Sequence, residues 1–200
     1  MKTKKTAFLM SAACLGVAVL VSLTVGAQEP RADGPNYRDG TNLDRPTKYR
    51  EWQFLSSSLN MSYQPPGDGS QPQLFQNVFV NPPSYRGFME TGRWPDETIF
   101  VLEIRRSSSE GAITGTGQFQ SDLVALEAEV KDSRFPDGWA FYDFGTAQSL
   151  ADVAQPLAGA QVARCIECHT EHTAVERTFV QFYPTLLEVA RRKGTVKPGF

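Results

Sequence analysis

The chain has 200 residues, of which 40% are hydrophobic and 21% charged, and its formal net charge is −2. This charge balance excludes the basic surface that nucleic-acid binding requires. The length suits one domain with a substantial hydrophobic core, and no internal repeat divides the chain.

The first 27 residues have the pattern of a signal peptide. Lys2, Lys4 and Lys5 form a basic start, residues 7–25 are almost wholly apolar, and the small residues at 25–27 offer a cleavage site. We expect cleavage after Ala27, export to the periplasm and no membrane attachment afterwards. An uncut membrane anchor is the alternative, because the apolar stretch is long enough to span a bilayer. Without its three lysines the chain keeps 17 basic and 22 acidic residues, a formal charge of −5.

The next segment, residues 28–45, is rich in Pro, Gly, Asp and Asn and poor in apolar residues. This composition indicates an extended or disordered N-terminal arm. From Thr47 to Leu59, apolar residues recur at spacings of three and four, which predicts a helix.

Four segments are predicted to be β-strands: 74–80, 98–104, 122–131 and 139–144. The third could also be a helix by composition, but its apolar residues alternate with charged ones, as in a strand with one buried face. Turns and loops join most of these segments, and such short connections favour an antiparallel sheet.

Three helices are predicted around these strands. Asn81 can cap a short helix that Pro82 opens and Gly92 ends. Residues 158–166 form a second helix, and a third runs from Pro184 to a stop at Gly194. The expected fold is α+β, a predominantly antiparallel sheet with flanking helices, in a single domain over residues 46–200.

The most informative motif is CIECH at residues 165–169. C-x-x-C-H is the attachment signature of c-type haem. Two thiols three residues apart on a helical turn can add to both haem vinyl groups, and the adjacent imidazole then faces the iron. The motif therefore predicts one covalent haem c, with Cys165 and Cys168 as the thioethers and His169 as the proximal iron ligand.

Two alternatives to haem stay open. A zinc site would need about four ligands, and His172 is the one other histidine that could join the motif, in a crowded single-segment site. A redox dithiol is expected after an early strand of a βαβ unit, whereas this motif follows a predicted helix near the C-terminus. A purely structural disulfide closing so short a loop would constrain little.

The sixth coordination position of the iron is expected to be vacant. Electron-transfer cytochromes usually fill it with methionine or histidine. Here no histidine is free to do so, and both methionines of the mature chain, Met61 and Met89, precede the motif. A vacant position would bind NO or a similar small nitrogen compound. The alternative is a low-spin centre with Met89 as the distal ligand.

Seven segments together resemble the cytochrome P-460 family over most of residues 49–190. They are YREW (49–52), VFVNPPSY (78–85), TGRWPDETIFVLEI (91–104), ALEAEVKDSRFP (125–136), WAFYDFG (139–145), CIECHTEH (165–172) and ERTFVQFYPTLLEVA (176–190). The resemblance implies an antiparallel β domain with flanking helices, usually a homodimer, that holds one five-coordinate haem c.

The resembled family contains two functional types. Cytochromes P-460 proper oxidise hydroxylamine, and a lysine is linked covalently to their haem. The related cytochromes c-prime-beta lack this link, line the distal pocket with phenylalanines and bind NO. Aligned on the family, the linking lysine falls in the window 86–90, which holds no lysine in this chain.

We therefore expect the c-prime-beta type, with Phe88 or Met89 over the distal face of the haem. Two other functions stay open: an enzyme that oxidises hydroxylamine or NO and passes electrons to a partner cytochrome, and a plain electron carrier. In the enzyme, Glu103 or Glu127 could accept a proton.

The strand at 139–144 supplies further pocket candidates. Alternation places Trp139, Phe141 and Asp143 on one face and Tyr142 and Phe144 on the other. The sequence leaves open which face meets the haem. The later segment from Phe182 to Pro184 is expected near the proximal side, because it follows His169 by about a dozen residues.

Overall fold

The computed structural model describes residues 33–61 and 73–200, so the expected signal peptide at 1–27 lies outside the described residues. Part of the N-terminal arm is described. There β1 (Tyr37–Arg38) and β2 (Asn42–Asp44) form an antiparallel hairpin, and β2 also pairs with β8 (Val153–Ala154). None of the helices described is both long and apolar enough to cross a membrane.

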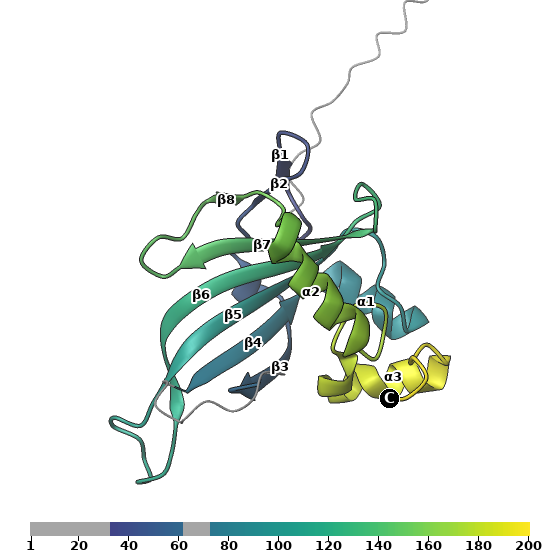
Figure 1. Ribbon diagram of the computed structural model, residues 1–200. Helices are drawn as coiled ribbons and strands as arrows, with labels where there is room; N and C mark the ends of the chain where they lie inside the picture. The colour runs from purple at the N-terminus through teal and green to yellow at the C-terminus, as the bar shows by residue number, and fades with distance from the viewer. Residues whose placement is uncertain (1–32, 62–72) are drawn as a thin grey trace, which may run out of the picture.

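The body of the molecule is an antiparallel five-stranded sheet in the order β3-β4-β5-β6-β7 (Figure 1). Its strands are β3 (Gln53–Leu59), β4 (Leu74–Val80), β5 (Thr98–Ser108), β6 (Phe119–Lys131) and β7 (Trp139–Thr146). Each strand pairs with its neighbour in sequence, as short connections favour. The predicted fold class and the four predicted strands are confirmed.

The helix predicted from Thr47 to Leu59 is wrong. A single 3₁₀ turn, η1 (Tyr49–Glu51), is helical, and the rest of the segment is β3, paired with β4. Serine hydroxyls compete for backbone hydrogen bonds and weaken a helix, and three serines follow one another at 56–58. Pairing with β4 satisfies the backbone groups of this segment instead.

The three other helices form where they were predicted. They are α1 (Pro82–Thr91), α2 (Gly159–Glu171) and α3 (Pro184–Lys193). α2 is longer than predicted and contains the whole C-x-x-C-H motif. Gly92 ends α1 in the left-handed region at φ 73°, and an added Cβ there would come within 2.8 Å of Lys193 on α3. The close approach of α1 to α3 therefore requires glycine.

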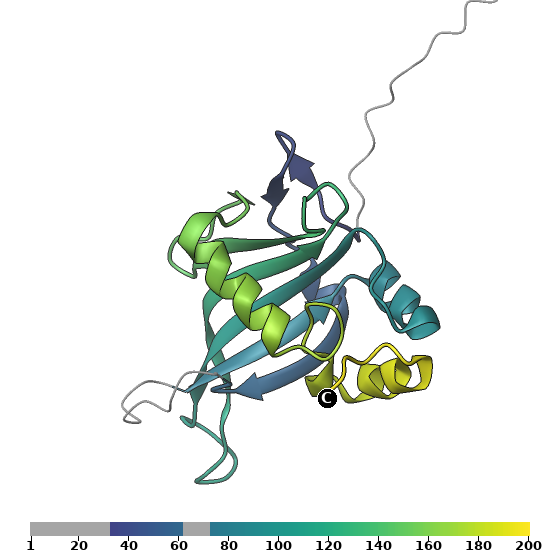
Figure 2. The same ribbon diagram turned by 45° about the vertical axis from the view of Figure 1, so that its right-hand side comes forward.

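The two faces of the sheet are covered differently. On one face, inward side chains of β4 to β7 pack with the N-terminal segment and β8 into a closed hydrophobic core; this side is called the core face. Its members include Leu43, Trp52, Phe79, Ile99, Val101, Leu126, Val130, Tyr142 and Phe144. On the other face, α2 runs across the strands, while α1 and α3 lie beside it (Figures 1 and 2). This second side is called the cavity face.

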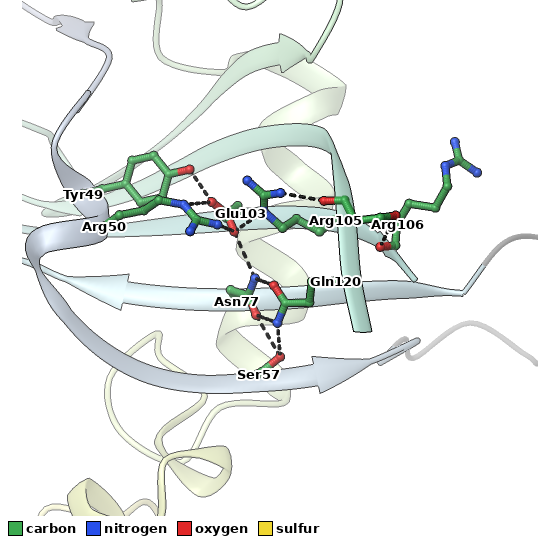
Figure 3. Close-up of polar contacts among 9 residues, drawn as sticks. Tyr49, Arg50, Ser57, Asn77, Glu103, Arg105, Arg106 and Gln120 are labelled. Atoms are coloured by element: carbon green, nitrogen blue, oxygen red, sulfur yellow. Dashed lines mark hydrogen bonds and ion pairs between the residues drawn. The ribbon is translucent and has the colours of Figure 1, made fainter. Parts of the chain in front are cut away.

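A buried carboxylate marks the core face. Glu103 of β5 is fully buried and accepts five hydrogen bonds: from the Tyr49 hydroxyl at 2.5 Å, two Arg50 nitrogens at 2.8 and 2.7 Å, Arg105 at 2.7 Å and Asn77 at 3.0 Å (Figure 3). Burial alone would raise the pKa of Glu103, but these hydrogen bonds outweigh it and lower the pKa to about 2.

Candidate functional site

The helix α2 presents both thiols and the imidazole of the motif from one side. Cys168 follows Cys165 by three residues and His169 follows it by four, so the three side chains are neighbours on the helix surface. None of the thirteen residues of α2 is buried. Helices that lie on sheets are usually held there by a buried apolar stripe. Here the inner side of α2 borders a cavity instead.

The cavity has a volume of about 420 Å³ and lies between α2 and the cavity face of the sheet. Cofactor pockets commonly measure about 300–1,000 Å³ and are mostly apolar with a few polar groups. The sheet side is lined by Ser56, Ser58, Met61, Gln76, Val78, Phe100, Leu102, Glu127, Ala128, Glu129, Phe141 and Tyr142, and the other side by Leu157, Cys165, Cys168, His169, Thr178, Phe179, Phe182 and Tyr183. The two thiols and the histidine thus share one cavity.

His169 is held in one orientation by its surroundings. Its Nδ1 lies 2.8 Å from the carbonyl oxygen of Arg177. A carbonyl only accepts hydrogen bonds, so Nδ1 carries the proton and donates it, which leaves the Nε2 lone pair for a ligand. The rings of Phe141 and Phe179 meet the imidazole edge-on, with centroids at 4.9 and 4.8 Å. This is how iron- and zinc-binding histidines are oriented in proteins.

The loop after α2 positions the Arg177 carbonyl. The Gln181 amide bridges this loop: its Nε2 donates to the carbonyl of His172 at 2.6 Å, and its Oε1 accepts from the Ala174 backbone N–H at 3.0 Å. At the next turn, Trp94 Nε1 donates to the Thr178 hydroxyl at 2.8 Å. The carbonyl that accepts the Nδ1 hydrogen bond is therefore part of a segment held in place by hydrogen bonds.

A carboxylate also approaches the imidazole. Glu129 Oε1 on β6 lies 3.2 Å from Nδ1 of His169. Burial alone would lower the pKa of His169, but this carboxylate and the bond to Arg177 outweigh it, so the pKa is raised.

The thiols have no features of a reactive dithiol. Cys165 and Cys168 are both free and partly buried. Burial raises the pKa of each thiol, and acidic neighbours raise it further: Glu127 and Glu129 for Cys165, Glu171 and Glu167 for Cys168. Redox-active and nucleophilic cysteines need the opposite, a lowered pKa.

The zinc arrangement is not formed in the part of the chain that the structure describes. There, no three His, Cys, Asp or Glu side chains gather closely enough to hold a metal ion. His172 lies at the end of α2, with its Nε2 3.8 Å from Glu171.

The residues present fit a haem. A largely apolar cavity, two neighbouring thiols and one imidazole with a fixed Nδ1 proton are what a haem held by two thioethers and one axial histidine needs. Two thiols and one histidine in this arrangement are the donor set of c-type cytochromes. The Cytochrome P460 family matches residues 46–180, and the chain belongs to this family. Membership implies a haem cofactor, as in a haem c cytochrome. No curated protein matches the chain.

Of the four residues proposed from the strand at 139–144, Phe141 lines the cavity and contacts His169. Tyr142 borders the cavity, but its hydroxyl donates to the Thr41 carbonyl on the core face at 2.9 Å. Phe144 is buried in the core on that same face. Trp139 packs against the side-chain cluster of α1 and α3 and is not among the lining residues.

Phe88 and Met89, the two residues expected over the distal face, do not line this cavity. Phe88 is fully buried against Trp94, with ring centroids 4.2 Å apart, and Met89 is 36% exposed. Neither lines the cavity. The physical reason is that α1 packs beside α3, whereas the wall of the cavity is the sheet itself. The window 86–90 is therefore away from the cavity, and no described lysine lines it.

The site also contains residues that sequence reasoning did not single out: Ser56, Ser58, Gln76, Leu102, Glu129, Arg177 and Phe179. One signal could have found Glu129. It alternates with apolar residues in β6 and so shares a face with Glu127, already named as a candidate. The Arg177 carbonyl has no sequence signal, because every residue carries one.

Glu127 and the segment from Phe182 reach the cavity as well. Burial raises the pKa of Glu127, and the neighbouring charge of Asp143 raises it further. Phe182 and Tyr183 line the cavity, and Phe182 stacks on Phe179, which contacts His169. Glu103, the other predicted proton acceptor, lies on the core face and does not line the cavity.

Proposed function

We propose that this chain is an exported mono-haem c-type cytochrome whose five-coordinate iron binds NO or a similar small nitrogen ligand. Cys165 and Cys168 would form the thioethers, and His169 would be the proximal ligand. The observation that carries the proposal is the orientation of His169. Its Nδ1 donates a hydrogen bond to the Arg177 carbonyl, and its ring lines the same cavity as both thiols.

The sheet side of the cavity supports a vacant sixth position. It offers no histidine or lysine among the described residues, and Val78, Phe100 and Leu102 make much of it apolar. Met61 is the one methionine there; it is 39% exposed, and Gln76 holds its backbone N–H and carbonyl at 2.9 and 3.0 Å. Met89, the ligand of the electron-carrier alternative, is outside the cavity.

In this proposal the bound haem supplies an iron that accepts a ligand lone pair, and the chain controls access to it. Apolar side chains disfavour water and ions, because burying a charge without a partner is costly. Neutral diatomic ligands pay no such cost. The Arg177 carbonyl and the rings of Phe141 and Phe179 keep His169 aligned throughout.

The remaining parts of the proposal come from the sequence. They are cleavage after Ala27 with release into the periplasm, a haem without a lysine link, and a homodimer as the family resemblance implies. Sedimentation analysis of the purified protein tests the dimer, and N-terminal sequencing tests the cleavage.

The main test uses protein made in a host with working haem-maturation machinery. We expect a Soret band that persists after acid–acetone extraction, a haem peptide whose mass shows links to Cys165 and Cys168 alone, and a high-spin ferric spectrum that changes on adding NO. A low-spin ferric spectrum would reject the vacant position. A third covalent link in the haem peptide would reject the c-prime-beta assignment.

One observation favours a second function, oxidation of hydroxylamine. The Glu127 carboxyl lines the cavity, and burial and the charge of Asp143 raise its pKa, the direction expected of a carboxylate that acts as a general base. If the protein turns over hydroxylamine with an artificial electron acceptor, Glu127→Gln should lower kcat by roughly 100-fold or more, the usual contribution of a general base. Glu110→Gln, in the exposed β5–β6 loop, is the matched control. Tight NO binding without turnover would favour the ligand-binding function.

A further inference from the structure

We infer that Glu129 is a positioning residue for His169, a second acceptor for the Nδ1 proton that strengthens the bond from Nε2 to the haem iron. The inference rests on the proposed haem and concerns the electronic character of its proximal ligand. It assigns a role to a residue that was absent from both the motif and the pocket residues predicted from the sequence.

The distances place two acceptors around one proton. The Arg177 carbonyl oxygen lies 2.8 Å from Nδ1 and makes the hydrogen bond. Glu129 Oε1 lies 3.2 Å from the same nitrogen. The Glu129 side chain is 11% exposed, and its Oε1 is buried and makes no well-aligned hydrogen bond to any residue that the structure describes. A buried carboxylate oxygen without a partner is costly, so its direction toward Nδ1 is informative.

The strand register explains why this carboxylate is shielded from solvent. Glu129 of β6 lies opposite Phe100 of β5 and opposite Phe141 of β7. All three residues line the cavity. A carboxylate in a row of phenyl rings has little water to solvate it, so its field acts on the imidazole at short range with little screening.

The chemistry follows from charge. A carboxylate that shares the Nδ1 proton pushes electron density into the imidazole ring and makes Nε2 a stronger donor. Stronger donation stabilises ferric over ferrous iron and so lowers the midpoint potential. The carbonyl of Arg177 alone would orient the ring but would supply less charge.

Three variants of the holoprotein test the role. Glu129→Gln removes the charge and keeps the shape, and Glu129→Asp keeps the charge but withdraws it by one methylene. Glu127→Gln is the matched control, because it removes the same charge from the same strand and the same cavity without a contact to Nδ1. The readouts are the iron–histidine stretching band of the ferrous protein in resonance Raman spectra and the midpoint potential.

We expect Glu129→Gln to move the iron–histidine band to lower frequency, Glu129→Asp to move it part of the way, and Glu127→Gln to leave it in place. The midpoint potential should rise more in Glu129→Gln than in Glu127→Gln. An unchanged band in Glu129→Gln, with equal potential shifts in both glutamine variants, would overturn the inference and leave Glu129 as one more nearby charge.

The test separates this inference from the proposed function. If wild type shows no iron–histidine band because its ferrous iron is six-coordinate, the vacant position is wrong, and the difference in potential between the glutamine variants still decides the role of Glu129. If Glu129→Gln does not fold, the Glu129→Asp band decides it, since a purely structural residue would leave that frequency unchanged.

Discussion

The two faces of the five-stranded sheet solve opposite problems with the same strands. On the core face, Glu103 has all its hydrogen-bond partners within the chain, and apolar side chains close around it. On the cavity face, Glu129 Oε1 makes no well-aligned hydrogen bond to a described residue, and the covering helix α2 buries none of its residues. The first face is complete as a protein core, whereas the second is shaped around a site.

The acids on the two faces show how the difference arises. Glu103 and Glu127 are both on central strands, yet the pKa of Glu103 is lowered and that of Glu127 is raised. Both are desolvated by burial. Glu103 has two arginines beside it, whereas Glu127 has the carboxylate of Asp143. The carboxylate whose charged form is stabilised therefore lies on the core face, and the one whose charged form is disfavoured lies on the cavity face.

The largest expected effect follows from removing both thiols. In Cys165→Ala/Cys168→Ala, we expect loss of covalent Soret absorbance and loss of amide hydrogen-exchange protection along α2, with local opening free energies falling toward 0 kcal/mol. The reason is that no residue of α2 is fully buried by the chain. Amides of β5 and β6 should keep their protection, because the core face is intact. Mass-spectrometric hydrogen exchange measures both regions at once.

The control for the double variant is Thr170→Ala, an exposed position on α2. It should leave both the haem and the protection of α2 in place. If α2 stays protected in the double variant, the helix is held by the chain itself, and the two faces of the sheet differ less in how they are covered.

A smaller effect is expected from the core face. Glu103→Gln leaves Arg50 and Arg105 without their carboxylate, and breaking a buried ion pair by removing one partner costs roughly 3 kcal/mol or more. Urea denaturation should show about 3 kcal/mol lost from the free energy of unfolding, while the haem spectrum of the folded protein stays unchanged. A spectral change would mean that the two faces are coupled.

The matched control is Glu110→Gln in the loop between β5 and β6, where the residue is exposed. A surface substitution of this kind should change the stability by less than about 0.5 kcal/mol.

The next largest effect is expected from acid, which lowers the free energy of unfolding by protonating Glu103 on the core face. The pKa of Glu103 falls from the ordinary 4.5 to about 2 on folding, so its stabilisation is present above pH 4.5 and is lost as pH falls toward 2. Between about pH 5 and pH 3 this should remove on the order of 2 kcal/mol from the wild-type free energy of unfolding. Glu103→Gln should have a shallower pH dependence over this range, measured by urea denaturation at each pH. Equal slopes would mean that other carboxylates carry the acid sensitivity.

Much of the fold could be predicted from local patterns. Alternation predicted β6, an aromatic run after a turn predicted β7, and the Asn-Pro and Gly signals predicted α1. The strand β3 was missed because its spacing is helical and its pairing partner, β4, begins fifteen residues after it ends. Local spacing cannot report a hydrogen-bond partner that lies across a loop.

The part of the site that consists of neighbouring residues in the sequence could be predicted, whereas the part that depends on how elements pack could not. The motif at 165–169 named both thiols and the imidazole. The far wall was assigned to α1, but the cavity is walled by the sheet, since α1 packs with α3 at its edge. Which face of β7 meets the cavity was equally undetermined, because an apolar strand buried on both faces carries no sign of direction.

The smallest expected effect tests whether the sheet, and not α1, forms the wall opposite α2. Met89→Leu should leave the ferric spectrum unchanged and alter the free energy of unfolding by less than about 0.5 kcal/mol. The reasons are that Met89 on α1 is 36% exposed and that the substitution conserves side-chain volume. Met61→Leu is the matched comparison, since Met61 lines the cavity. If a methionine affects the haem spectrum, it should therefore be Met61. A spectral change in Met89→Leu alone would place α1 over the haem and contradict the sheet as the wall of the site.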